Sequence, residues 1–156
     1  MSAAQVEIQT EFLFEINLDV PSSVYLGKTP VGKRYIAGVT GGSFEGPKLR
    51  GRALAGGADW AIIRPDHVLQ LDVRLTLETD DGALIYMTYR GARHGSKDVM
   101  MRLAAGETVE PSEYYFRTAP FFETGSENYA WLNGIVSAAI GQDTPGGVIY
   151  RVFQIL

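Results

Sequence analysis

Apolar and polar residues alternate along residues 71–91, LDVRLTLETDDGALIYMTYRG, and this is the most regular pattern in the chain. A period of two predicts two β-strands, each with one apolar and one polar face. Asp80-Asp81-Gly82 between them fits a three-residue hairpin loop, in which Gly82 supplies the left-handed backbone conformation. The sequence therefore predicts an antiparallel hairpin.

The loop also sets the register of this hairpin. Thr79 lies opposite Ala83, and counting back along both strands places Asp72 opposite Arg90. The apolar face then carries the pairs Leu77–Ile85, Leu75–Met87 and Val73–Tyr89, and the polar face carries Thr76–Tyr86, Arg74–Thr88 and Asp72–Arg90. A slip by one residue would exchange the two faces, so the register is strongly specified.

The rest of the chain reads as short strands separated by turns. Strands are expected at residues 6–18, 35–40, 49–54, 58–65, 112–118 and 148–155. Loops or turns are expected at 21–34, at the bend GGSFEGPKLRG (41–51), at 141–147 and at 92–110, a long mobile loop with a helical turn near 99–103. The sequence TGSE at 124–127 resembles a helix capping box, so a short helix is expected at 129–133. Residues 135–140 fit either a strand or a continuation of that helix.

These elements predict an all-β protein formed by a single domain, residues 1–156. The chain has 18 glycines and 7 prolines, which is typical of short strands joined by frequent turns. About eight or nine strands with one short helix leave a sheet whose edges are best removed by closing it into an antiparallel barrel. A barrel of about eight strands is either filled by side chains or holds one small ligand.

The amino-acid composition argues against some classes of binding partner and indicates a cellular location. A formal net charge of −4 gives no electrostatic reason to expect a nucleic acid or an anionic membrane. The chain contains no cysteine, which removes disulfides and thiol chemistry and fits a reducing cytoplasm. The first residues, MSAAQVEIQTEF, lack a secretion signal, and no apolar stretch is long enough to span a bilayer. We therefore expect a cytoplasmic protein.

Several separate motifs resemble one known family. GGSFEGPKLRG, GGADW, LDVRLTLETDDGALIY, EYYFRTAPFFETG and YAWLN occur together and in order, and they resemble the DUF3237 family, also called UPF0311. The resemblance runs from about Arg34 to the C-terminus. It implies a small calycin-like β-barrel that forms oligomers, while the activity of the family is not generally known. The family pattern includes the positions of Asp72, Arg74, Gly82, Arg117 and Trp131; residues 92–110 and the first strand match no family motif.

The polar face of the hairpin supplies the candidate catalytic residues Asp72, Arg74 and Arg90, with Tyr86 beside them. If the face is exposed, these side chains form a surface ion-pair ladder of little energetic value. If the face lines a cavity, an arginine binds an anionic or phenolic oxygen and Asp72 acts as a base. The sequence leaves both interpretations open, and the second requires the apolar face to be covered from outside.

Other candidates for a substrate pocket are Tyr115, Arg117 and Trp131. Tyr115 and Arg117 share one face of the strand at 112–118, where Tyr115 could stack on a flat ligand; the alternative is an exposed face opposite core aromatics. Trp131 fits either core packing or a lid over a barrel mouth. Asp59 follows a Gly-Gly turn, and we expect it to bond its own backbone.

Cofactor motifs are absent from the sequence. GGSFEG and GTPVG lack the spacing of a phosphate loop, no serine sits in a nucleophile elbow, and no dinucleotide fingerprint follows a strand. The two histidines, His67 and His94, are unclustered, so no metal site is expected and both are expected to be exposed.

Three functions remain. The first is a cofactor-independent enzyme of the lyase or isomerase type, which transfers protons on a small, partly aromatic molecule inside the barrel. The second is a barrel that binds a small molecule without catalysis. The third is a structural protein with a packed core. A cavity, and the direction in which Asp72 and Arg74 point, would separate them.

Overall fold

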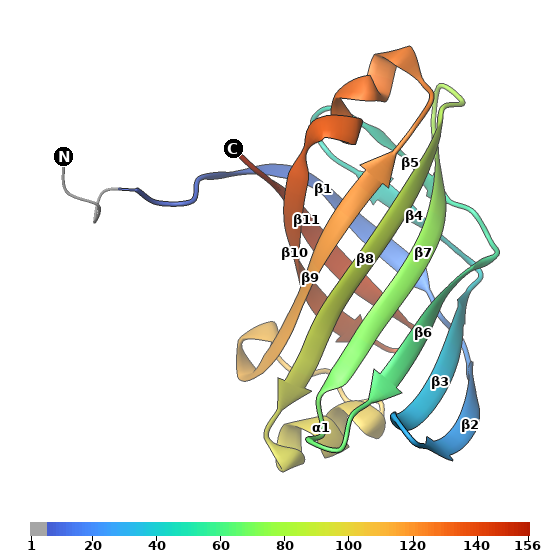
Figure 1. Ribbon diagram of the computed structural model, residues 1–156, viewed down its shortest axis with the longest axis vertical. Helices are drawn as coiled ribbons and strands as arrows, with labels where there is room; N and C mark the ends of the chain where they lie inside the picture. The colour runs from blue at the N-terminus through green and yellow to red at the C-terminus, as the bar shows by residue number, and fades with distance from the viewer. Residues whose placement is uncertain (1–5) are drawn as a thin grey trace.

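The computed structural model describes residues 6–156 and contains one highly curved antiparallel sheet (Figure 1). Eight strands form a closed ring in the order β7-β5-β4-β1-β11-β10-β9-β8, with β8 paired back to β7. Their bounds are β1 Thr10–Asp19, β4 Gly41–Glu45, β5 Arg50–Ala53, β7 Leu69–Thr79, β8 Leu84–Gly95, β9 Tyr114–Glu123, β10 Val136–Thr144 and β11 Gly147–Ile155. The predicted antiparallel β-barrel is confirmed.

The sheet forks along β7. One edge of β7 pairs with β8 over its whole length, from Leu69↔Arg93 to Glu78↔Leu84. The other edge pairs with β5 near Thr79 and with β6 (Gly57–Ile63) near Leu69. From β6 the sheet continues through β3 (Gly32–Val39) to β2 (Ser23–Thr29), outside the closed ring. One end of the barrel is therefore flanked by an extra three-stranded segment.

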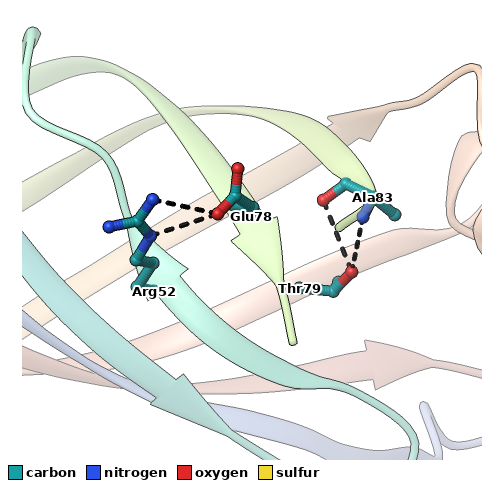
Figure 2. Close-up of polar contacts among 4 residues, drawn as sticks. All are labelled: Arg52, Glu78, Thr79 and Ala83. Atoms are coloured by element: carbon teal, nitrogen blue, oxygen red, sulfur yellow. Dashed lines mark hydrogen bonds and ion pairs between the residues drawn. The ribbon is translucent and has the colours of Figure 1, made fainter. Parts of the chain in front are cut away.

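The predicted hairpin is confirmed residue by residue. Asp72 pairs with Arg90, Val73 with Tyr89 and Leu77 with Ile85. At the loop, the Thr79 amide donates to the Ala83 carbonyl over 2.9 Å, and the Ala83 amide donates to the Thr79 hydroxyl over 2.9 Å. Gly82 has φ +87°, as the loop requires. Figure 2 shows this end of the hairpin and the neighbouring Arg52–Glu78 ion pair, which joins β5 to β7.

The apolar face of the hairpin points into the barrel. Leu71, Val73, Leu75, Leu77, Ile85, Met87 and Tyr89 are all at most 3% exposed. They pack with buried side chains of β1, β4, β9 and β11, including the aromatic contacts of Phe14 with Phe44 and Phe122. The barrel interior is thus the hydrophobic core, and its burial provides most of the driving force for closing the sheet.

Three helical segments accompany the strands within residues 6–156; the helical turn expected near 99–103 is part of the first, and the short helix expected at 129–133 is the third. The α-helix α1 (Lys97–Ala104) and the short 3₁₀ helix η2 (Pro111–Glu113) lie between β8 and β9, and the 3₁₀ helix η3 (Glu127–Gly134) lies between β9 and β10. In Figure 1, α1 lies at the lower end of the barrel and η3, coloured orange, covers the upper end. Leu132 of η3 is fully buried and closes that end. Within residues 6–156, none of the helices has the length and apolar character needed to span a membrane.

Several predicted loops are strands. Residues 21–34 contain β2, the turn that follows it and the first three residues of β3, and GGSFE at 41–45 is β4. β10 extends to Thr144, which leaves Pro145 and Gly146 for the turn. These segments contain turn-forming residues, but pairing with neighbouring strands determines their conformation, because tertiary contacts override a local preference. The strand predicted at 6–18 begins at Thr10.

The predicted mobile loop at 92–110 is also wrong in its first part. β8 continues to Gly95, and Ser96 caps α1 by accepting a hydrogen bond from the Val99 amide over 3.2 Å. The capping box at 124–127 does not form either. The Thr124 hydroxyl accepts from the Ser126 amide and donates to the Leu84 carbonyl, and η3 starts after Ser126. A local turn competes successfully for the threonine hydroxyl.

Candidate functional site

The polar face of the β7–β8 hairpin lies on the outside of the barrel. Since Leu71 and Val73 fill the interior, the alternating residues Asp72 and Arg74 must point outward. Asp72 Oδ1 and Arg90 Nε are 4.0 Å apart, and the Arg90 side chain is 78% exposed. The interpretation that this face lines the barrel interior is wrong. A catalytic role on the outer surface, where these residues border a groove with Phe121, stays a prediction.

The candidates from β8 and β9 also face outward. Tyr86 is exposed on β8, and Tyr115 stacks on the exposed His94 with ring centroids 4.9 Å apart. The Arg117 guanidinium lies 5.2 Å from the Tyr115 ring and donates to the Phe116 carbonyl. Their expected place in an interior pocket wall is wrong, because Tyr114 and Phe116 occupy the inward positions of β9.

Trp131 lies in η3 at the closed end of the barrel. It packs partly buried against the core, and Lys48 approaches its ring to 5.3 Å. The core-packing interpretation of Trp131 fits this position. His67, in the turn after β6, is exposed as expected. No cluster of three or more potential metal ligands occurs within residues 6–156.

The barrel interior contains a cavity of about 380 Å³ at the forked end. Its wall is formed by β3 and β6, by the first half of β7, by the last part of β8 and by the β10–β11 turn. Most of the lining is apolar, including Ala61, Ile63, Leu71, Val73 and Phe116. The size lies within the ordinary range of small-molecule sites. The lining also contains polar side chains, which can orient a ligand.

Asp59 of β6 is one of two acids that line this cavity, and the other is Asp143. Asp59 alternates with Ala61 and Ile63, so its carboxylate faces the interior, and Oδ1 accepts a hydrogen bond from the Asp72 amide over 2.9 Å. Burial raises the pKa of Asp59 to about 6, although the Asp72 amide and the charges of Arg93 and Arg34 act in the opposite direction. A carboxyl group with this pKa can accept and release a proton near neutral pH.

Two buried tyrosines lie close to Asp59. Tyr89 and Tyr150 are 3% and 2% exposed, and their rings meet edge to face at 5.0 Å. Burial raises the pKa of both phenols, and the charge of Asp59 raises them further. The two hydroxyls also hydrogen-bond to each other, so both stay protonated and one of the two O–H groups remains free to donate to a ligand oxygen.

An ion pair joins β8 to β10 at the same cavity. Arg93 Nη1 and Asp143 Oδ2 are 2.5 Å apart, and the two side chains are 24% and 23% exposed. The Asp143 amide donates to the Tyr114 hydroxyl over 2.9 Å. Arg93 Nε is buried and has no hydrogen-bond partner among the described residues. The guanidinium is thus oriented by Asp143 while part of its donor capacity remains unused.

The sequence pattern assigns no function to the five polar residues described above, which are Asp59, Tyr89, Arg93, Asp143 and Tyr150. The alternation places Tyr89 on the apolar face of the hairpin, as the structure does, but an apolar face predicts core packing and not a ligand contact. Arg93 continues the inward phase Met87, Tyr89, Gly91, and this alternation could have been followed past Gly91. The expectation that Asp59 bonds its own backbone is wrong, since its partner is the amide of Asp72 on the next strand. No local pattern shows which strands bring Asp59, Arg93 and Asp143 together.

The chain is similar to proteins whose function is unknown. A family model described as "Protein of unknown function (DUF3237)" matches residues 8–155. A UPF0311 protein of Rhodopseudomonas palustris is 35% identical over 149 residues, which cover 96% of this chain and 97% of that protein.

Solved structures agree with the barrel. A beta-barrel like protein from Acinetobacter baumannii superposes with a TM-score of 0.85 at 40% identity, covering 99% of this chain and 100% of that one. An enzyme from Penicillium herquei superposes with a TM-score of 0.75 at 22% identity over the full length of both chains. At that identity, the second likeness concerns the fold alone.

Proposed function

This chain belongs to the DUF3237 family, and we propose that it is a cofactor-independent enzyme that transfers protons on a small, partly aromatic molecule held inside the barrel. The reaction is of the lyase or isomerase type. In place of the outer-face residues Asp72, Arg74 and Arg90, the general base is Asp59. The observation that carries this proposal is a carboxylate of pKa about 6 in an otherwise mostly apolar cavity.

The chemistry follows from the groups around Asp59. Asp59 removes a proton from a carbon next to a carbonyl group of the substrate; the electron pair of the C–H bond forms a C=C bond, and the π pair of the carbonyl group moves onto its oxygen. Arg93 and the free O–H group of the Tyr89–Tyr150 pair supply hydrogen-bond donors that stabilise the resulting enolate. The proton then returns to a different atom, which completes an isomerisation, or a neighbouring leaving group departs, which completes a lyase reaction.

The aromatic character of the substrate is inferred from the wall of the cavity. Tyr89, Phe116 and Tyr150 present rings that meet one another edge to face, with Phe116 and Tyr150 centroids 5.4 Å apart. A flat ring packs well against such a surface. The lack of cysteine fits the cytoplasm as the setting, and the homo-oligomer implied by the family resemblance stays part of the proposal.

A barrel that binds a small molecule without catalysis is the second candidate. It uses the same cavity and needs no base, so the raised pKa of Asp59 favours the enzyme. The third candidate, a packed structural barrel, required an interior without room for a ligand. The interior instead contains a cavity of about 380 Å³, which does not fit a packed structural barrel.

The test is deuterium exchange into an aryl-fused ketone such as 2-tetralone, followed by ¹H NMR in D₂O. The wild-type protein should accelerate loss of the α-proton signals, and Asp59→Asn should lower the rate by about 100-fold or more. Asn keeps an oxygen for the Asp72 amide, so the β6–β7 contact survives. The matched control is Glu123→Gln, which removes an exposed carboxylate from the end of β9.

Two outcomes would redirect the proposal. Equal exchange rates for the wild type and Asp59→Asn would remove Asp59 as the base. Loss of exchange in Asp72→Asn, with Asp59→Asn unaffected, would move the chemistry to the outer groove. Co-purification of an unaltered metabolite, with no exchange of any ketone, would favour the binding barrel.

A further inference from the structure

We infer, on the basis of the proposed site, that the substrate is an uncharged molecule, because the cavity holds one acid, Asp59, that forms no ion pair within residues 6–156. The charged groups of the lining are Asp59, Asp143 and Arg93. Arg93 and Asp143 neutralise each other across 2.5 Å. Asp59 is left with a backbone amide as its hydrogen-bond partner. An ionised Asp59 therefore gives the empty cavity a negative charge.

An anionic substrate is excluded by this charge. A carboxylate or phosphate in the cavity would approach Asp59 at short range, with walls such as Leu71 and Val73 providing little screening. Arg93 could compensate only by leaving Asp143, which would then be a buried carboxylate without its partner. Either arrangement leaves two negative charges unpaired, where the cavity without the anion has one, so anions should bind much more weakly than neutral analogues.

A cationic substrate is disfavoured for a different reason. An ammonium group would pair with Asp59, but it would lose its water to a mostly apolar wall, and such a buried pair often yields no net stabilisation. The pairing would also hold Asp59 in its ionised form and occupy the oxygen that has to remove a proton. The apolar wall and the role of Asp59 both favour a neutral substrate.

The polar atoms that remain define the neutral group. Tyr89 and Tyr150 together present one free hydroxyl donor, and Arg93 has donor capacity that Asp143 does not use. These donors fit an uncharged oxygen acceptor, either a ketone or a hydroxyl group. The substrate class is therefore a neutral, partly aromatic ketone or alcohol that acquires negative charge only during the reaction.

Three naphthalene derivatives with the same ring test this inference. They are 2-acetylnaphthalene, 2-naphthoate and 2-naphthylmethylammonium, which are neutral, anionic and cationic at pH 8. Binding to the full chain is measured by isothermal titration calorimetry. The ketone should bind at least about tenfold more tightly than either ion, equivalent to about 1.4 kcal/mol. Equal or tighter binding of either ion, or binding of none of the three, overturns the inference.

Asp59→Asn tests the cause of the discrimination. Removing the charge should raise the affinity for 2-naphthoate about tenfold or more and leave the affinity for 2-acetylnaphthalene within about threefold. The control Glu123→Gln should leave both affinities unchanged. If Asp59→Asn still rejects the anion as strongly as the wild type does, the inference is wrong. Asp59→Ser provides a second neutral variant if Asp59→Asn does not fold.

The binding readout separates this inference from the proposed function. Charge discrimination without any deuterium exchange would keep the neutral-ligand cavity and reject catalysis. Exchange without discrimination would keep Asp59 as a base and reject the substrate class.

Discussion

The Asp59 carboxylate accepts a hydrogen bond from the backbone amide of Asp72 at 2.9 Å. β6 and β7 pair on both sides of this point, at Asp59↔Val73 and again at Ile62↔Gln70, and the carboxylate takes the Asp72 amide between them. Asp72, which the sequence analysis proposed as the base, thus contributes only its backbone amide to the cavity site, as a hydrogen-bond donor to Asp59. The side chain of Asp72 lies on the other face of the sheet.

The pH dependence of stability should change when Asp59 is replaced. Folding raises the pKa of Asp59 from 3.8 to about 6, so between these pH values the native state binds more protons than the unfolded chain does. The free energy of unfolding therefore falls as the pH rises through this window, by about 3 kcal/mol for this group. The Asp59→Asn variant lacks this titrating group, so its free energy of unfolding should not fall in this way. Its stability relative to the wild type should therefore increase from pH 4 to pH 8.

Urea denaturation of both proteins at pH 4 and pH 8 measures this difference. Asp66→Asn is the control, because Asp66 is exposed and its pKa is lowered to about 2 by its hydrogen bond with Arg64. A constant difference between wild type and Asp59→Asn across this pH range would contradict a raised pKa.

Breaking the Arg93–Asp143 pair should destabilise the barrel more than breaking the Arg52–Glu78 pair. Arg93→Met leaves a mostly buried carboxylate without its partner, and we expect a loss of about 2 kcal/mol. Arg52→Met breaks an exposed pair between β5 and β7 (Figure 2), and the loss should stay below about 1 kcal/mol. Chemical denaturation of the two variants checks the order, and equal losses would show that Asp143 is well solvated.

Gly141 should be sensitive to the addition of a single methyl group. A Cβ at Gly141 would lie 2.6 Å from the Phe116 ring, so the ring has to move. Phe116 lines the cavity, and we expect Gly141→Ala to lower the affinity for 2-acetylnaphthalene and to cost about 1–2 kcal/mol of stability. Gly134→Ala is the matched control, because nothing lies within 4 Å of its added Cβ. Unchanged binding by Gly141→Ala would mean that the ligand does not contact Phe116.

Trp131→Ala should separate stability from binding. Trp131 packs partly buried against the core at the end of the barrel closed by η3, away from the forked end. Its truncation should lower the free energy of unfolding by about 2 kcal/mol and leave ligand affinity unchanged. Phe116→Ala, inside the cavity, should weaken binding instead. Calorimetric titration of both variants decides this, and weaker binding by Trp131→Ala would place a ligand contact at the closed end.

Sequence patterns alone predict the class of fold and its most regular hairpin. Local alternation and Gly82 define the β7–β8 register from Leu77–Ile85 to Asp72–Arg90, because both strands and the loop are contiguous in the chain. The same pattern identified which side chains share a face. These features depend on neighbours within about twenty residues, and a sequence pattern reports such neighbours directly.

The tertiary structure alone decided which face is the inside and where the polar groups meet. Asp59, Arg93 and Asp143 come from three strands, and they converge because the sheet forks at β7 and closes from β8 through β9 and β10. Burial of Leu71 and Val73 turns Asp72 and Arg74 outward, and Asp59 is the acid of the interior cavity that forms no ion pair within residues 6–156. Alternation predicts two faces, but only closure of the barrel buries one of them, because the direction in which the sheet curls depends on contacts between distant strands.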